Sequence, residues 1–154
     1  MPAAMDVLSP IGSTISICIA ARPATNTAAG YAALTWIEVG EVDAIGETGS
    51  ESALNSRTRL KDGAVVKSKG ARNYGALPLT LAMVPGDLGQ QALRTAEESQ
   101  TDFPIMTKFP DGTIDYSMCF VMSFKDNIGN AEGGTIMSAS NLEVNRKPIR
   151  VYPV

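Results

Sequence analysis

Side chains able to carry out catalysis are scarce in this sequence. It contains no histidine, so its serines lack the imidazole base that most nucleophilic hydrolases use. A serine–lysine pair assembled from distant positions stays open, although no Ser-x-x-Lys motif with flanking support occurs. Glu97 and Glu98 are neighbours in a predicted helix and point about 100° apart, so they do not face each other as an acid and a base. The sequence therefore predicts a protein that is not an enzyme and offers no catalytic residue.

Metal and cofactor sites are equally hard to find. The segment 126–130 begins like a calcium-binding loop, but Ile128 stands where an oxygen ligand is needed. Cys18 and Cys119 lie far apart in apolar stretches, and no Cys/His spacing typical of zinc sites occurs. We expect two buried free thiols, with a disulfide between them as the alternative. No glycine-rich phosphate-binding loop is present, so neither a metal nor a cofactor is predicted.

Length and charge restrict the class of protein further. The 154 residues suffice for one domain with its own core. The net charge of −3 argues against a protein that clamps a nucleic-acid backbone, which needs clustered bases. The N-terminal region lacks the basic start of a signal peptide, and no apolar run approaches the ~20 residues of a membrane span. We expect a single domain, 1–154, made in the cytoplasm and without a membrane partner.

Alternation of apolar and polar residues predicts mainly strands. The clearest run is 116–124, whose large residues fall on one face and whose small residues fall on the other. We expect the large residues to face the core. Asp-Gly turns at 61–63 and 110–112 separate further strands. The other predicted strands cover residues 14–19, 34–39, 53–60, 64–69, 77–83, 103–109, 135–144 and 148–152.

One helix is predicted over residues 88–99. Asp87 is a good N-cap, and Gln90 three residues later completes a capping-box pattern. One face of this helix is apolar and carries Leu88, Ala92, Leu93 and Ala96. The expected fold class is mainly β: a β-sandwich or barrel-like domain with one flanking α-helix. Residues 1–12, which include two prolines, are expected to form a flexible N-terminal arm.

The charges fall into two blocks. Residues 38–51 hold five acids and no base, and residues 57–72 hold six bases and one acid. The blocks could be two arms of one hairpin that neutralise each other, or separate surfaces that complement each other head to tail between copies. The long segment 40–75 favours a hairpin or loop that reaches a neighbour. The candidate inter-subunit residues are Glu38, Glu41, Asp43, Glu47, Glu51, Arg57, Arg59, Lys61, Lys67, Lys69 and Arg72.

Several strand positions carry small polar residues instead of charges. Ser138, Ser140 and Asn141 are examples. A sheet of this kind can pack a core on one face and line a wet channel with the other. Its edge strands would then pair with the next subunit and so be protected from aggregation. An ordinary half-solvated sandwich is the alternative explanation of the same pattern.

Taken together, these features resemble the major tail tube proteins of siphophages. The resemblance rests on the stretch 34–43 (LTWIEVGEVD), the glycine-broken acidic loop after it, the segment 53–63, and the order of the later elements up to Tyr152. It implies a β-sandwich with a flanking helix, similar also to the type VI secretion tube. In that family six subunits form a hexameric ring whose strands make one shared β-barrel around a lumen. Rings stack into a tube, and segment 40–75 would be the element that bridges them.

The resemblance also implies the function of a structural virion protein, the major tail tube subunit of a long non-contractile phage tail. The partners would be further copies of the chain and the tape-measure, tail terminator and tail tip proteins. Double-stranded DNA would pass through the lumen without specific binding, which an acidic or neutral wall favours because like charges repel. The lumen candidates are Asp115, Asp126 and Glu143.

Two other functions stay open. One is another virion ring protein, such as a tail terminator or a head-decoration protein, which would form a single closed ring. The other is a monomeric β-sandwich that binds a sugar or protein ligand on an exposed aromatic platform. Tyr31, Trp36 and Tyr74 are the candidates for that platform.

Overall fold

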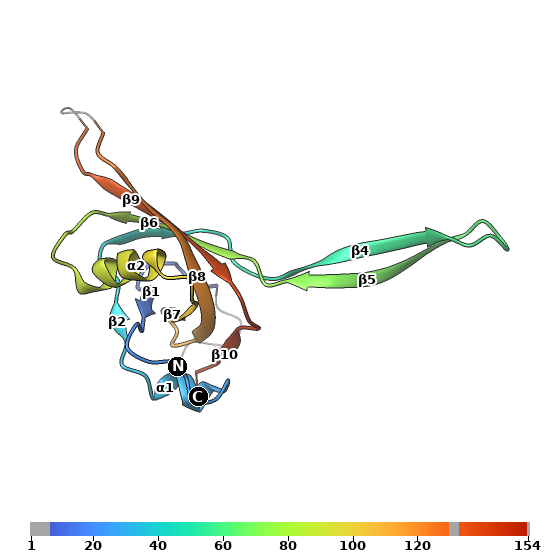
Figure 1. Ribbon diagram of the computed structural model, residues 1–154, viewed down its shortest axis with the longest axis horizontal. Helices are drawn as coiled ribbons and strands as arrows, with labels where there is room; N and C mark the ends of the chain where they lie inside the picture. Colours follow the sequence, from blue (N-terminus) through green and yellow to red (C-terminus); the bar gives the residue numbers. More distant parts are fainter. Residues whose placement is uncertain (1–6, 130–132, 154) are drawn as a thin grey trace.

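The computed structural model describes residues 7–129 and 133–153, and shows a body from which a long two-stranded arm projects (Figure 1). The mainly β fold expected from the sequence is confirmed. No helix in the described ranges is long and apolar enough to cross a membrane. The elements are β1 (Thr14–Ile17), α1 (Ala28–Ala32), β2 (Ile37–Glu38), β3 (Val42–Ile45), β4 (Glu51–Thr58), β5 (Val65–Asn73), β6 (Ala76–Ala82), α2 (Leu88–Glu98), β7 (Phe103–Lys108), β8 (Ile114–Asn127), β9 (Met137–Val144) and β10 (Ile149–Val151).

The body is one curled antiparallel sheet. Its strand order is β2-β1-β7-β8-β9-β6-β3, with β10 paired to the first part of β8. The two end strands, β2 and β3, follow each other in the chain and are separated only by residues 39–41. The Val39 N–H donates to the Ile15 carbonyl, and the Ala82 N–H donates to the Glu41 carbonyl, both at 2.9 Å. The corner at residues 39–41 therefore joins the two ends of the sheet, which gives the body its barrel-like shape.

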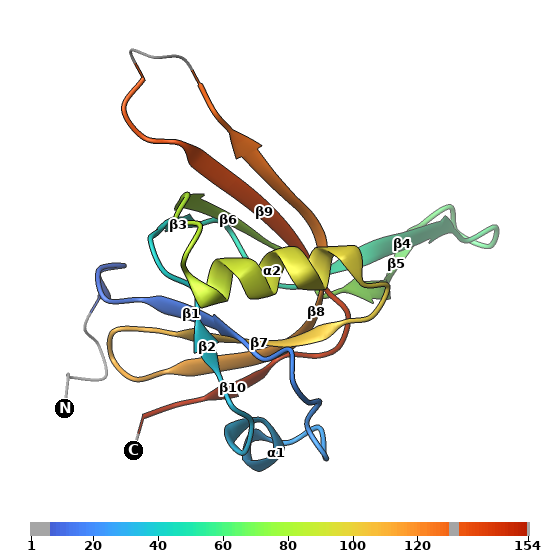
Figure 2. The same cartoon turned by 60° about the vertical axis from the view of Figure 1, so that its left-hand side comes forward.

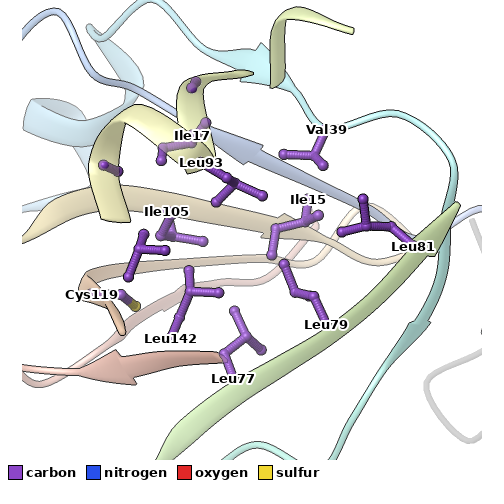
Figure 3. Packing of buried hydrophobic residues seen from close by; sticks show 13 residues of the cluster. Ile15, Ile17, Val39, Leu77, Leu79, Leu81, Leu93, Ile105, Cys119 and Leu142 are labelled. Carbon is purple, nitrogen blue, oxygen red and sulfur yellow. The ribbon is translucent and has the colours of Figure 1, made fainter. Parts of the chain in front are cut away.

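Helix α2 packs against the concave face of this sheet (Figure 2). The core between them is built from isoleucines and leucines of β1, β6, β7 and β9, together with Leu93 of the helix (Figure 3). Leu88, expected on the same helix face, is instead exposed. The helix begins so close to the corner that a side chain at Gly89 would collide with the backbone of Glu38 and Val39. The first turn therefore contacts the sheet through Gly89, and Leu88 points into solvent.

The N-terminus of α2 is fixed to the corner by two side chains. Asp87 is the N-cap, as expected: its carboxylate accepts from the Gln90 N–H at 2.9 Å and also from the Gly40 N–H at 3.0 Å. The reciprocal half of the capping box is absent. The Gln90 side chain, only 2% exposed, accepts from the Val84 N–H and donates to the Gly40 and Ala82 carbonyls, at 2.9–3.0 Å. Buried backbone groups at the corner need hydrogen-bond partners, so the Gln90 side chain bonds to them and not back to the N-cap.

The expectation that the large-residue face of β8 carries the core is right for Tyr116 and Met118, but it misses the other face. Cys119 and Val121, from the small-residue face, are buried in the core under α2. Tyr116, from the large-residue face, belongs to a second apolar cluster beside α1. The pairing of β8 with β9 shifts register just after Val121, and this bulge turns Phe124 back toward the main core. Both faces of the first half of β8 are therefore covered, which simple alternation does not anticipate.

Helix α1 and strand β3 have no counterpart among the expected elements, and the strand expected at 34–39 shrinks to β2. Thr27 caps α1 by accepting from the Gly30 N–H at 3.3 Å. The helix carries Tyr31, whose ring stacks on Tyr116 at 5.2 Å between centroids. The expectation of two buried free thiols is confirmed, because Cys18 and Cys119 are both buried and form no disulfide with each other.

Candidate assembly surfaces

The arm is a separate two-stranded sheet formed by β4 and β5. Nearly every residue in it is exposed, including Leu54 and Val65. The eight residues of β4 span roughly 27 Å at about 3.4 Å per residue, so the arm extends well beyond the body (Figure 1). An isolated two-stranded ribbon is only marginally stable in water. A surface that covers the arm would therefore stabilise it.

The tip of the arm is held in one conformation by its own hydrogen bonds. The Arg59 N–H donates to the Ala64 carbonyl and the Gly63 N–H to the Arg59 carbonyl, both at 2.9 Å. Gly63 has a φ of +67°, a conformation that glycine adopts readily. Asp62 accepts from the Ala64 N–H at 3.0 Å and forms an ion pair with Arg59 at 2.9 Å. This turn, expected from the Asp-Gly pair, presents Leu60 fully exposed at the apex.

All six bases of the basic block lie on the arm. Residues 51–73 hold six bases against two acids, a net charge of +4. The hypothesis that the two charge blocks neutralise each other across one hairpin is wrong, because the basic block forms both the end of β4 and its partner β5, whereas four of the five acids precede β4. Arg72 is used at the root of the arm, where it donates to Ser50 Oγ at 2.9 Å and lies over the Tyr74 ring.

The acidic block belongs mostly to the body. Glu38 lies in β2, Glu41 at the corner and Asp43 in β3, while Glu47 follows β3 and Glu51 begins the arm. All five side chains are exposed. The structure thus separates the candidate inter-subunit residues into a basic set on the arm, where Glu51 also lies, and an acidic set on the body. We call the acidic set, which surrounds and follows the corner between β2 and β3, the acidic edge: Glu38, Glu41, Asp43 and Glu47. Segment 40–75 is therefore part of the body in its first residues and becomes a free hairpin only from residue 51.

One face of the sheet formed by β6, β9 and the second half of β8 is not part of the core. In β6 the leucines 77, 79 and 81 are buried, while Pro78 and Thr80 are exposed. Across the strands, Pro78 pairs with Asn141 and Thr80 with Ala139, so these four side chains share the outer face. We call this surface the open face; it consists of Ala44, Pro78, Thr80, Ser123, Lys125, Ala139, Asn141 and Glu143.

Ser138 and Ser140 do not lie on the open face, contrary to the channel pattern expected from the sequence. Both are buried on the core side of β9. The Ser138 hydroxyl donates to Asp126 at 2.6 Å, and the Ser140 hydroxyl donates to the Ser123 carbonyl at 2.9 Å. Asn141 alone of the three faces outward.

The three lumen candidates are not brought together. Arg94 of α2 donates through Nη2 to both carboxylate oxygens of Asp126, at 2.7 and 2.8 Å. This contact lowers the pKa of the carboxyl below its ordinary value. Asp115 accepts two hydrogen bonds from Arg150 of β10, from Nε at 2.7 Å and from Nη2 at 2.8 Å. Glu143 is the one candidate on the open face.

Two strand edges beside the open face lack a partner strand in the described part of the chain. One is the second half of β8, residues 120–127, which pairs with β9 on one side only. The other is β3, which pairs with β6 on one side only. In the order β8-β9-β6-β3, these edges lie on opposite sides of the open face. Such edges are templates for pairing with another chain.

The aromatic platform proposed for a binding module does not form. Tyr31 is buried, and Trp36 packs on Tyr116 with 5.9 Å between ring centroids. The Trp36 indole N–H donates to the Tyr31 carbonyl at 3.1 Å. Tyr74 lies instead at the root of the arm. The three rings serve the core and the arm, so they do not make one exposed binding surface.

Comparisons with known proteins agree on the fold. No protein-family model matches the chain, and no curated protein matches it by sequence. Among solved structures, the SPP1 tail tube matches with a TM-score of 0.63 at 14% identity, covering 92% of this chain and 77% of that chain. The sheath/tube terminator of the extracellular contractile injection system PVC matches with a TM-score of 0.67 at 11% identity, covering 96% and 99%. The tube terminating cap of the anti-feeding prophage (AFP) matches with a TM-score of 0.70 at 11% identity, covering 99% and 96%.

These likenesses establish the class of fold. Each covers more than nine tenths of this chain, so the match is not confined to one part of the fold. At 11–14% identity it is the backbone arrangement that is shared. The protein has a tail-tube-like fold.

Proposed function

We propose that this protein is a non-enzymatic structural component of a phage-like tail, and specifically the tube subunit that forms stacked hexameric rings. The arm is the single observation that carries this proposal. A basic, almost entirely exposed ribbon of this length is only marginally stable by itself. An acidic surface on another copy would complement it. The fold likeness to tubes and tube terminators supports the same reading.

Ring formation would use the two free strand edges. The edge of β8 in one copy would pair with the edge of β3 in the next, which extends the sheet from subunit to subunit. Antiparallel pairing of this kind satisfies backbone groups that are otherwise left to water. The open faces would then line a continuous barrel. Their side chains are small or polar, and Glu143 and Lys125 balance in charge, which suits a wall past which DNA slides without binding.

Growth of a tube would use the arm. A contact between two different surfaces of the same chain repeats from copy to copy and produces an open filament unless it closes. The arm and the acidic edge of the body are such a pair of surfaces. The tape-measure, terminator and tip proteins are the further partners of this proposal, the location is the virion tail, and the tail is assigned to the long non-contractile type.

A tube terminator or cap is the second candidate, because two of the matching structures carry those descriptions. Negative-stain electron microscopy of the purified chain at high concentration separates the candidates. Tubes or stacks of rings with a central hole are the result expected for a tube subunit. Single rings that never stack would favour the terminator. Monomers under all conditions, including with the tail tip proteins that start assembly, would contradict both.

A further inference from the structure

A hollow of about 950 Å³ opens at the root of the arm. One wall is the segment 42–50, and the opposite wall is the turn between β7 and β8 together with residues 8–13. No residue of α2 lines it, so the hollow is the end of the curled sheet that the helix does not fill. The mouths of β-barrels are common places for ligand sites, which measure about 300–1,000 Å³.

The inner part of the hollow is apolar. Ile45, Leu77 and Val144 line it from the three neighbouring strands β3, β6 and β9, and we call them the apolar floor. Leu77 is buried, and the other two are half-buried. Phe109, also half-buried, lines the wall across from them. Apolar groups that remain in contact with water in this way gain free energy when an apolar ligand covers them.

The rim of the hollow carries bases. Arg72 at the arm root and Lys147 after β9 both line it and are exposed. The Val144 N–H donates to the Gly75 carbonyl at 2.9 Å, so the segments that carry the two bases run side by side. Arg72 donates to the neutral Ser50 hydroxyl, and neither base forms an ion pair within the described ranges. An anion at the rim would therefore meet two bases that no carboxylate neutralises there.

A third base and two acids complete the charges of the lining. Asp115 accepts two hydrogen bonds from Arg150, so these two charges neutralise each other. Asp43 is exposed and lies where the pairing of β3 with β6 shifts register. The lining thus holds three bases and two acids, which leaves one excess positive charge. A complementary ligand is apolar over most of its length and carries a negative charge at one end.

The arm tip of another copy does not match this hollow, because its three bases would approach a rim that is itself positive. We infer that the hollow is a binding site for a long-chain carboxylate, a fatty-acid-like amphiphile. Its chain lies on the apolar floor, and its head group meets Arg72 and Lys147. The inference goes beyond the proposed function and does not depend on it, since the dilute subunit should bind the ligand before any ring forms.

Titration of the dilute subunit with cis-parinaric acid tests the inference. This probe is a long-chain carboxylate whose fluorescence rises in apolar surroundings. Its binding should saturate at one molecule per subunit, at probe concentrations below those at which micelles form. Oleic acid should displace the probe more strongly than oleyl alcohol, which has the same chain without the charge. Oleylamine, whose charge is opposite, should be the weakest competitor.

Three variants separate the roles of charge and shape. Lys147→Glu should weaken probe binding about tenfold, because an exposed ion pair is replaced by a repulsion. It should change the competition by the uncharged alcohol less than about twofold. Lys125→Glu makes the same charge change on the open face and should bind as the wild type does. Ile45→Trp, which fills the floor, should weaken the probe and the alcohol alike, about tenfold or more. Melting temperatures check that the variants fold, and Lys147→Glu changes an exposed side chain, so its result stands if Ile45→Trp misfolds.

Several results would overturn the inference. They are no saturable binding, equal displacement by oleic acid and oleylamine, or equal probe affinities for Lys147→Glu and Lys125→Glu. Expulsion of the probe when tubes form would also overturn it, because a second copy would then be the occupant of the hollow. None of these results concerns whether tubes form, which tests the proposed function separately.

Discussion

Replacing Gln90 by alanine should destabilise the subunit far more than the same change at its neighbour Gln91. The Gln90 side chain makes three hydrogen bonds at the corner that joins the ends of the sheet. Its removal leaves the Val84 N–H and the carbonyls of Gly40 and Ala82 without that partner. Each such buried group costs about 1–3 kcal/mol. Since water can reach part of this region, we expect a total loss of about 3–5 kcal/mol.

The neighbouring residue provides the matched control. Gln91 is exposed and makes one hydrogen bond, from its amide to the Pro85 carbonyl at 2.7 Å. Gln91→Ala should therefore cost less than about 1 kcal/mol. A third variant, Gln90→Glu, keeps the volume of the side chain but removes both donated hydrogen bonds. It should lose about as much stability as Gln90→Ala, which separates hydrogen bonding from packing.

Urea unfolding of the dilute subunit, followed by far-UV circular dichroism, measures these differences. For a domain of about 150 residues, 1 kcal/mol corresponds to about 2–4 °C in the melting temperature. Gln90→Ala should therefore also melt about 6–20 °C lower than the wild type. Equal midpoints for the Gln90 and Gln91 variants, with unchanged slopes, would refute the view that this amide closes the barrel-like body.

Three further predictions concern charge, pH and the thiols. Reversing Arg57, Arg59 and Lys61 at the arm tip to glutamate should leave the melting temperature unchanged and abolish tubes. Additional reversal of Asp43 and Glu47 on the body to lysine should restore the tubes, which electron microscopy detects. Because Arg94 lowers the pKa of Asp126 below its ordinary value of 3.8, the stability from that contact is present above pH 3.8 and lost as the pH falls through the lowered pKa. Acid titration followed by circular dichroism should show that Asp126→Asn removes this part of the pH dependence, and an unchanged profile would argue against it. Burial raises the pKa of Cys119 to about 12, so a thiol reagent at pH 8 should not modify this residue until the chain is unfolded, and rapid labelling of the native subunit would contradict its placement in the core.

The elements that could be predicted from the sequence are those whose signals are local. The Asp-Gly turns at 61–63 and 110–112 predicted two hairpins, and both are present, one between β4 and β5 and one between β7 and β8. The carboxylate of Asp87 caps α2 as its position suggests. These signals act within a few residues, so they do not depend on the rest of the fold.

The features that the sequence did not reveal depend on distant contacts. Helix α1 has only five residues, too few to show a helical period. The bulge in β8 reverses the buried face halfway along the strand, and only its pairing with β9 shows it. The wrong face for Ser138 and Ser140 has a similar cause, because their hydroxyls donate to Asp126 and to the Ser123 carbonyl, partners on the neighbouring strand β8 that the sequence alone does not place beside them.

The sequence showed two blocks of opposite charge, but not where these blocks lie in the fold. Two blocks of opposite sign are compatible both with a neutral hairpin and with two separate surfaces. Only the pairing of β4 with β5 decides between them. Of the lumen candidates, Asp115 and Asp126 face bases from elements far along the chain, Arg150 and Arg94. Sequence distance conceals such pairs.

The central claim is that the arm carries assembly and contributes nothing to the folding of the body. Paired electron microscopy and melting of the full chain and of a variant with residues 51–73 replaced by a short glycine-serine turn test it most directly. We expect tubes for the full chain and single rings or monomers for the variant. The two melting temperatures should agree within about 3 °C, because the arm is exposed along nearly all its length. Tubes from the variant, or an unfolded variant, would contradict it.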